Sequence, residues 1–129
     1  MALDKAEVQI VEVTKAQVII KPWGHETIIA DSPAYGCKLL LVKKGHRLSL
    51  QRHKLRDETW YILRGNMAIF TSSTPGHRRY LYTGDVITIP RGVWHRIAAE
   101  QGDVKLIEVT NGYVEGDIER KEDDYGRED

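Results

Sequence analysis

The feature that most constrains this chain is a series of short apolar runs, each of strand length and separated from the next by a turn rich in Gly, Pro, Asp or Asn. Several runs alternate apolar and polar residues, and no segment of helical period exceeds two turns. Alternation with period two is typical of strands that cover a core on one side. About ten such strands in 129 residues predict an all-β sandwich or barrel of one domain.

The strand pattern divides the chain into three parts. We expect residues 1–20 to supply edge strands, residues 21–112 to form the barrel and residues 113–129 to form a charged C-terminal tail. Gly65 and Asn66 predict a tight hairpin between the runs 58–64 and 67–72. The tail lacks an apolar face, which favours a solvated segment.

Composition narrows the class of protein. Basic and acidic residues number 19 each, so the net charge is zero and a nucleic-acid partner is not expected. Cys37 is the single cysteine, which agrees with a reducing compartment. The N-terminus has no signal-peptide pattern, and no apolar run reaches the ~20 residues of a membrane helix. We therefore expect a cytoplasmic protein without a membrane partner.

Four side chains with metal-ligand chemistry occur at two places in the strand pattern. Gln51 and His53 are two residues apart in an expected strand, so both point to the same face. Glu58 opens the next expected strand, and His95 follows a Pro-Gly turn. Amide oxygen, imidazole and carboxylate groups that converge can bind a divalent cation. The sequence therefore predicts a metal site at the mouth of the barrel.

These two stretches resemble the two motifs of the cupin superfamily. The first motif is matched by Gly45, Gln51, His53, Glu58 and Gly65, and the second by Gly84, Pro90, Gly92 and His95. Every spacing fits, and the single departure is Gln51, where most cupins have His. The resemblance implies a small jelly-roll β-barrel with the metal site inside it, formed by Gln51, His53, Glu58 and His95.

Further short segments of the sequence resemble the cupin domain of type II mannose-6-phosphate isomerases. They include Lys21-Pro22-Trp23-Gly24, Glu58-Thr59-Trp60, Pro90-Arg91-Gly92, Ile107-Glu108-Val109 and Tyr125-Gly126-Arg127. In many bacteria that domain is the C-terminal part of a bifunctional isomerase and mannose-1-phosphate guanylyltransferase, and nothing here resembles the guanylyltransferase half. The chain departs from the family at His53-Lys54-Leu55, where a run of three His is usual, and at Thr59, where His is usual.

The resemblance implies a metal-dependent isomerase that converts mannose-6-phosphate to fructose-6-phosphate. Zinc is the metal it favours, and the ligand set would also accept manganese, nickel, iron or cobalt. Glu108 or a metal-bound hydroxide is the expected base, and Arg96 the second catalytic residue. Arg56 and Arg47 are the expected substrate-binding residues, because a guanidinium fits a phosphate with two hydrogen bonds. A homodimer is expected, since cupins often pair through their N-terminal strands.

Several alternatives stay open at this level. The altered His53-Lys54-Leu55 run motivates a non-catalytic metal cupin that binds a sugar or metabolite. Another metal-cupin enzyme, such as a dioxygenase, is a further alternative. Glu108 could form a salt bridge at the rim instead of acting near the metal. The Tyr125-Gly126-Arg127 triplet matches the family's ending, where the tail lies back over the domain instead of being solvated.

Overall fold

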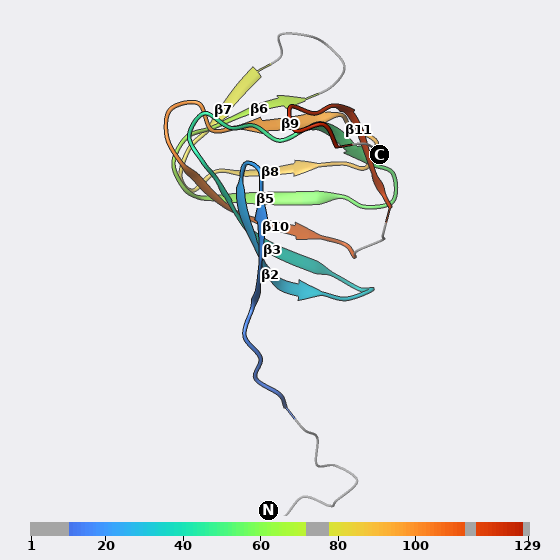
Figure 1. Cartoon of the computed structure of the whole chain (residues 1–129). Helices are drawn as coiled ribbons and strands as arrows, with labels where there is room; N and C mark the ends of the chain where they lie inside the picture. The colour runs from blue at the N-terminus through green and yellow to red at the C-terminus, as the bar shows by residue number, and fades with distance from the viewer. Residues whose placement is uncertain (1–10, 72–77, 113–115, 128–129) are drawn as a thin grey trace, which may run out of the picture.

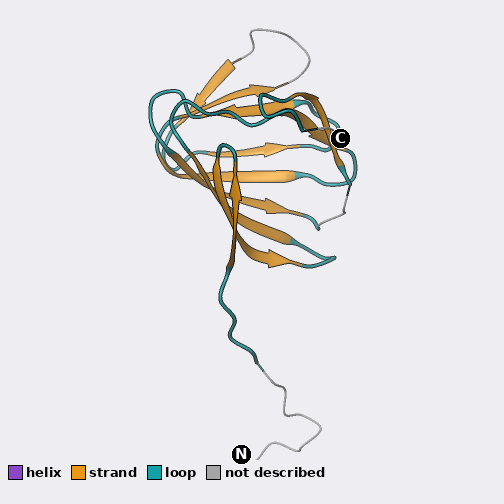
Figure 2. Cartoon of the chain, viewed as in Figure 1, coloured by secondary structure: helices purple, strands orange, loops and turns teal. Residues whose placement is uncertain are grey.

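The architecture was obtained as a computed structural model, which describes residues 11–71, 78–112 and 116–127. These residues form eleven β-strands and no helix (Figure 2). The strands are β1 (Gln17–Lys21), β2 (Gly24–Asp31), β3 (Gly36–Val42), β4 (Leu50–His53), β5 (Glu58–Arg64), β6 (Met67–Thr71), β7 (Arg78–Leu81), β8 (Val86–Ile89), β9 (His95–Ala98), β10 (Val104–Thr110) and β11 (Ile118–Glu122). Within these ranges, no helix is long and apolar enough to span a membrane.

The strands form two antiparallel sheets that close around a common core (Figure 1). The larger sheet has the order β1-β2-β3-β10-β5-β8, and the smaller sheet has the order β11-β4-β9-β6-β7. Strands that are neighbours in sequence often lie in different sheets, as in a jelly roll. The expected all-β, single-domain jelly roll is therefore confirmed.

The core lies between the sheets and is built from the inward residues of alternating strands. In β5, Trp60 and Ile62 point inward while Tyr61 is exposed, and in β10 Val104 and Leu106 are completely buried. Inward side chains of the smaller sheet, chiefly Met67, Ile69 and Ile97, meet them. This apolar centre fixes the spacing of the two sheets, so that polar residues at the strand ends face one another across the barrel.

One turn depends on a glycine for steric reasons. Gly24 follows the β1–β2 turn with φ of 153°, and a Cβ at this position would lie 1.9 Å from the carbonyl oxygen of Leu41 in β3. A side chain cannot be placed there without moving the β2–β3 backbone pair. Gly24 therefore allows β2 to approach β3 closely where β2 begins.

The predicted hairpin at Gly65-Asn66 is wrong. The strands on either side, β5 and β6, belong to different sheets, and β5 pairs with β10 and β8 instead. A turn with φ of 93° at Gly65 is equally compatible with a hairpin and with a connection between two sheets. Local turn chemistry could not distinguish the two, because long-range burial of Ile62 and Met67 decides the pairing.

The two ends of the chain also differ from the simplest expectation. Residues 11–16 form no strand and extend away from the barrel, whereas Gln17–Lys21 forms the edge strand β1 (Figure 1). Residues 1–10, the earlier part of the expected N-terminal strands, lie outside the described residues. At the other end, β11 pairs with β4 and Tyr125 packs against the core. Residues 116–127 are therefore part of the barrel and not a solvated tail.

Candidate metal centre

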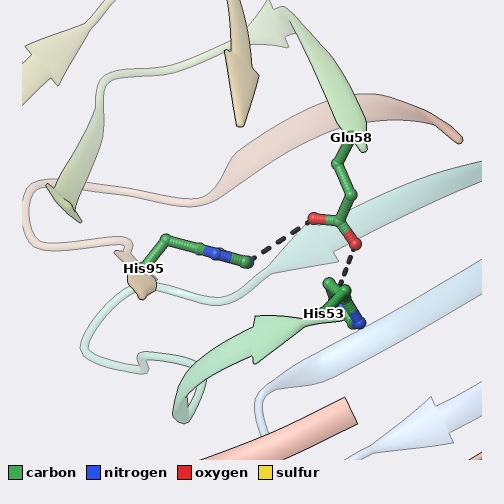
Figure 3. Close-up of side chains that lie close together, drawn as sticks. All are labelled: His53, Glu58 and His95. Carbon is green, nitrogen blue, oxygen red and sulfur yellow. Dashed lines mark ion pairs between the residues drawn. The ribbon is translucent and has the colours of Figure 1, made fainter. Parts of the chain in front are cut away.

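Three buried side chains from both sheets meet at one end of the barrel. His53 ends β4 and His95 begins β9 in the smaller sheet, and Glu58 begins β5 in the larger sheet. Figure 3 shows the carboxylate of Glu58 between the two imidazoles. Glu58 Oε1 lies 2.7 Å from His53 Nε2, and Glu58 Oε2 lies 3.5 Å from His95 Nε2. The exposed fractions are 3%, 2% and 2%, so the cluster is shielded from water.

The backbone around the cluster explains why these residues converge. Gly92 N donates to the carbonyl oxygen of His53 at 2.6 Å, which ties the turn before β9 to the end of β4. The side chain of Asp57 accepts from the backbone N–H of Arg91 at 2.8 Å, which ties the same turn to the start of β5. The Pro-Gly turn is thus bonded to both ends of the loop that joins His53 to Glu58.

Several polar atoms of the cluster lack hydrogen-bond partners among the described residues. His95 Nδ1 lies 2.9 Å from the carbonyl oxygen of Val93, to which Nδ1–H can donate, and Nε2 is the ring nitrogen that faces Glu58. Among the described residues, neither oxygen of Glu58 nor Nε2 of His95 has a hydrogen bond of acceptable geometry. Buried polar atoms without hydrogen bonds are rare unless another group satisfies them.

The donor set fits a divalent cation. The ligand atoms of His53, Glu58 and His95 all lie within 4.8 Å of one another. Two imidazole nitrogens and one carboxylate oxygen are the ligands of catalytic zinc sites, which keep further positions for water or substrate. A metal centre at this position is therefore plausible on the chemistry of the residues present.

The fourth predicted ligand, Gln51, lies beside the cluster. Gln51 is the register partner of His95 across β4 and β9, and together with His53 and Glu58 it lines a cavity. Its Oε1 accepts a hydrogen bond from the hydroxyl of the fully buried Ser49 at 2.8 Å. The amide oxygen retains a second lone pair, so ligation by Gln51 stays a prediction.

Glu108, the predicted base, faces the cluster from β10. Burial raises the pKa of Glu108 well above its usual range, and the nearby charge of Glu58 raises it further. Burial also acts to raise the pKa of Glu58, but the close imidazoles of His53 and His95 hold it well below its usual range. The pKa values of the two carboxyl groups are therefore shifted in opposite directions.

A cavity of about 370 Å³ opens beside these carboxyl groups. Its walls carry five basic and five acidic side chains: Lys21, Lys38, Arg56, Arg120 and Arg127, and Glu26, Asp31, Glu58, Glu108 and Asp117. Lys21 and Lys38 lie 3.7 and 3.6 Å from Glu26. The volume is that of a small-metabolite site, and its polar walls suit a charged, oxygen-rich ligand.

The predicted arginines separate into two groups. Arg56 lines the cavity, and its Nη2 lies 3.3 Å from His53 Nε2 and 3.6 Å from Glu58 Oε1. Arg47 and Arg96 are not among the cavity-lining residues and instead hold the C-terminal segment. Arg47 forms a two-bond pair with Asp124 at 2.6 and 2.8 Å.

Arg96 has the more buried position of the two. Its guanidinium donates to the carbonyl oxygens of Leu48 and Glu122 at 2.9 and 3.1 Å, and to the Glu122 carboxylate at 3.2 Å. Strand alternation places Arg96 on the face opposite His95. The structure therefore does not bring Arg96 or Arg47 to the cluster, contrary to the sequence-based expectation.

Residues 8–123 match the protein family described as mannose-6-phosphate isomerase C-terminal. The chain belongs to this family.

Similar proteins of the family are much longer than this chain. The xanthan biosynthesis protein XanB of Xanthomonas campestris is 38% identical over 120 residues, which cover 90% of this chain and 25% of that protein. The alginate biosynthesis protein AlgA of Pseudomonas aeruginosa is 38% identical over 114 residues, covering 84% and 23%. A mannose-1-phosphate guanylyltransferase of Klebsiella pneumoniae is 32% identical over 121 residues, covering 90% and 25%. The chain thus spans about a quarter of the length of these relatives.

Solved structures agree on the fold. CapF, a capsular polysaccharide assembling protein of Staphylococcus aureus, superposes with a TM-score of 0.74 at 18% identity, covering 85% of this chain and 35% of that chain. The nucleoside dehydratase Pac13 superposes with a TM-score of 0.71 at 16% identity, covering 89% and 93%. At these identities the likeness shows a shared cupin-like fold and nothing of the reaction.

The relatives correct the functional expectation. They are named as polysaccharide biosynthesis proteins and a guanylyltransferase, and this chain matches only their C-terminal cupin part. The expectation of a simple isomerase of mannose-6-phosphate is therefore wrong. The family is associated with enzymes of mannose metabolism, and this chain has the cupin fold expected for that family.

Proposed function

We propose that this chain is a metal-binding cupin domain that binds a phosphorylated sugar of mannose metabolism. The proposal depends most on one observation: three buried ligand atoms from opposite sheets converge beside a cavity lined with both basic and acidic side chains. Zinc is the proposed metal, with manganese, nickel, iron and cobalt as the other ions that the donors accept. When bound, such an ion supplies Lewis-acid attraction for sugar oxygens.

The residues around the metal centre have distinct proposed roles. Arg56 and Lys38 line the cavity and supply positive charge for a phosphate. His53 Nε2 is among the atoms that would hold the cation, and the guanidinium of Arg56, whose Nη2 lies 3.3 Å from it, would lie beside the bound ligand. Glu108 faces the cluster, burial raises its pKa, and it is the proposed acid–base group.

The experiment is a binding titration with a defined metal state. Metal content is measured after purification, and calorimetry then follows mannose 6-phosphate and mannose 1-phosphate binding to stripped and zinc-loaded protein. We expect zinc-dependent binding of at least one phosphate ester and none of free mannose. His53→Ala should lose both zinc and sugar, whereas His25→Ala, on the outward side of β2, should keep both. Equal binding by stripped and zinc-loaded protein would contradict the proposal.

The proposed assembly is a homodimer, in the cytoplasm, without nucleic-acid or membrane partners. One row of residues crosses the outer side of the larger sheet in register: Val18, Thr27, Leu39, Ile107, Tyr61 and Val86. Val18 and Val86 are exposed to 54% and 62%, so a second copy could cover apolar surface there. Light scattering should give twice the chain mass, and Val18→Asp should lower it to a monomer.

A further inference from the structure

The C-terminal segment 116–127 forms one wall of the cavity. Ile118 and Arg120 of β11 line the cavity, while Glu119 between them pairs outward with Arg52 at 2.7 Å. Asp117, immediately before β11, lines the same wall and is only 7% exposed. The segment is therefore placed to contact whatever the cavity binds.

One oxygen of Asp117 has a structural task. Its Oδ1 accepts two hydrogen bonds, from the backbone N–H groups of Lys54 and Leu55, both at 2.9 Å. These residues lie in the loop that joins His53 to Glu58. Oδ1 therefore fixes the loop between two of the proposed metal ligands, as an outer-shell partner does.

The other oxygen of Asp117 has no such task. Oδ2 is buried and has no hydrogen-bond partner among the described residues. A buried carboxylate oxygen normally accepts a hydrogen bond, because its desolvation is otherwise uncompensated. Since Asp117 lines the cavity, the missing donor can come from a bound molecule.

We propose that Asp117 recognises the ligand through Oδ2, which accepts a hydrogen bond from a hydroxyl group of a sugar. This inference rests on the proposed function and deepens it, because it assigns a hydroxyl subsite to the C-terminal wall. A carboxylate repels a phosphate and attracts a hydroxyl donor. Asp117 therefore also orients the ligand, with its phosphate directed away from this carboxylate and toward Arg56 and Lys38.

The substitution Asp117→Asn separates the two tasks. The backbone N–H groups of Lys54 and Leu55 require an acceptor, so the amide oxygen takes the place of Oδ1. The amide NH₂ then takes the place of Oδ2 and converts an acceptor into a donor. The loop keeps its hydrogen bonds, and only the interaction with a ligand hydroxyl is lost.

The test uses the zinc-loaded full chain, the mannose phosphates and their deoxy analogues at each ring carbon. We expect Asp117→Asn to bind the parent sugar phosphate ~10- to 100-fold more weakly, since hydrogen bonds to charged groups have this value. Zinc affinity and thermal midpoint should stay unchanged. For the deoxy analogue that lacks the recognised hydroxyl, the variant and the unaltered protein should bind equally.

Asp124→Asn is the matched control, because Asp124 lies on the same segment but pairs outward with Arg47. It should bind sugar phosphates as the unaltered protein does. Equal sugar binding by Asp117→Asn and the unaltered protein overturns this inference alone. A parallel loss of zinc also overturns it, since Asp117 would then act only through the loop. If the unaltered zinc protein binds no sugar phosphate, the proposed function fails as well.

Discussion

Replacement of Arg96 tests whether this arginine holds the C-terminal segment or contacts the ligand. Arg96 is 5% exposed, and its guanidinium joins β9 to the carbonyl oxygens of Leu48 and Glu122. In Arg96→Ala both carbonyl groups lose their donor, and the exposed Glu122 carboxylate loses its partner. We expect the edge strand β11 to separate from the smaller sheet more readily, while the metal ligands on β4, β5 and β9 stay in place.

The magnitude follows from these contacts. Each carbonyl that loses a charged donor costs about 1–2 kcal/mol. The Glu122 pair adds less than about 1 kcal/mol, because that carboxylate side chain is 62% exposed. Part of this loss is offset, since burial lowers the pKa of Arg96 and a buried guanidinium is costly to desolvate. The net decrease in the free energy of unfolding is about 2–4 kcal/mol, or roughly 8–16 °C in the thermal midpoint.

Calorimetry and urea unfolding measure this decrease, and zinc titration measures the metal site separately. Arg52→Ala is the control, because Arg52 also contacts β11 but its side chain is 33% exposed; it should cost less than about 1 kcal/mol. An unchanged stability of Arg96→Ala together with complete loss of sugar binding would refute the structural role and restore Arg96 to the ligand site.

Three further predictions concern stabilisation by the metal, the loss of stability at low pH and the backbone at Gly24. Zinc at 100 times its dissociation constant should add about 2.7 kcal/mol, or roughly 10 °C in calorimetry, and Glu58→Gln should remove most of this gain. The pair with Arg127 lowers the pKa of Asp123 from 3.8 to about 2, so its stabilisation is present above pH 3.8 and lost as pH falls toward 2. Asp123→Asn should therefore lower the free energy of unfolding by about 1 kcal/mol at pH 5 and much less at pH 2 in urea titrations; an equal loss at both would contradict the pair. Gly24→Ala should cost about 3 kcal/mol or more, because its Cβ would meet the carbonyl oxygen of Leu41; a midpoint within a degree of the unaltered protein would count against that contact.

The sequence pattern predicted the barrel and the three clustered ligands for a clear reason. The motif spacing places His53 at the end of one strand and Glu58 and His95 at the start of two others, all at the same end of the barrel. Period-two alternation then directs inward side chains to a shared centre. Local information is sufficient here because strand ends in a closed barrel converge.

Two features could not be predicted from local patterns. Arg47 was expected to bind the substrate, but β4 begins only at Leu50 and Leu48 lines the cavity, so the alternation of faces is interrupted before the strand. Strand pairing across the barrel, and not turn chemistry, decides such interruptions.

The second feature is β11, which has the sequence IERKE and no apolar face. It is held by backbone pairing with β4 and by side-chain contacts with other strands, among them Arg52 with Glu119 and Arg96 with the carbonyl oxygen of Glu122. A search for hydrophobic periodicity cannot detect a strand held in this way. The cavity-lining Asp117 and Arg120 were missed for the same reason, and only the Tyr125-Gly126-Arg127 resemblance indicated that the tail returns to the domain.

Anomalous diffraction from crystals grown with zinc tests the metal centre most directly. The account predicts one peak about 2.0–2.2 Å from a nitrogen of His53, a nitrogen of His95 and an oxygen of Glu58. Data from the Glu58→Gln protein should show that peak lost or strongly reduced. Zinc bound only at other surface positions, with both imidazoles turned away from Glu58, would contradict the metal centre and the sugar site that depends on it.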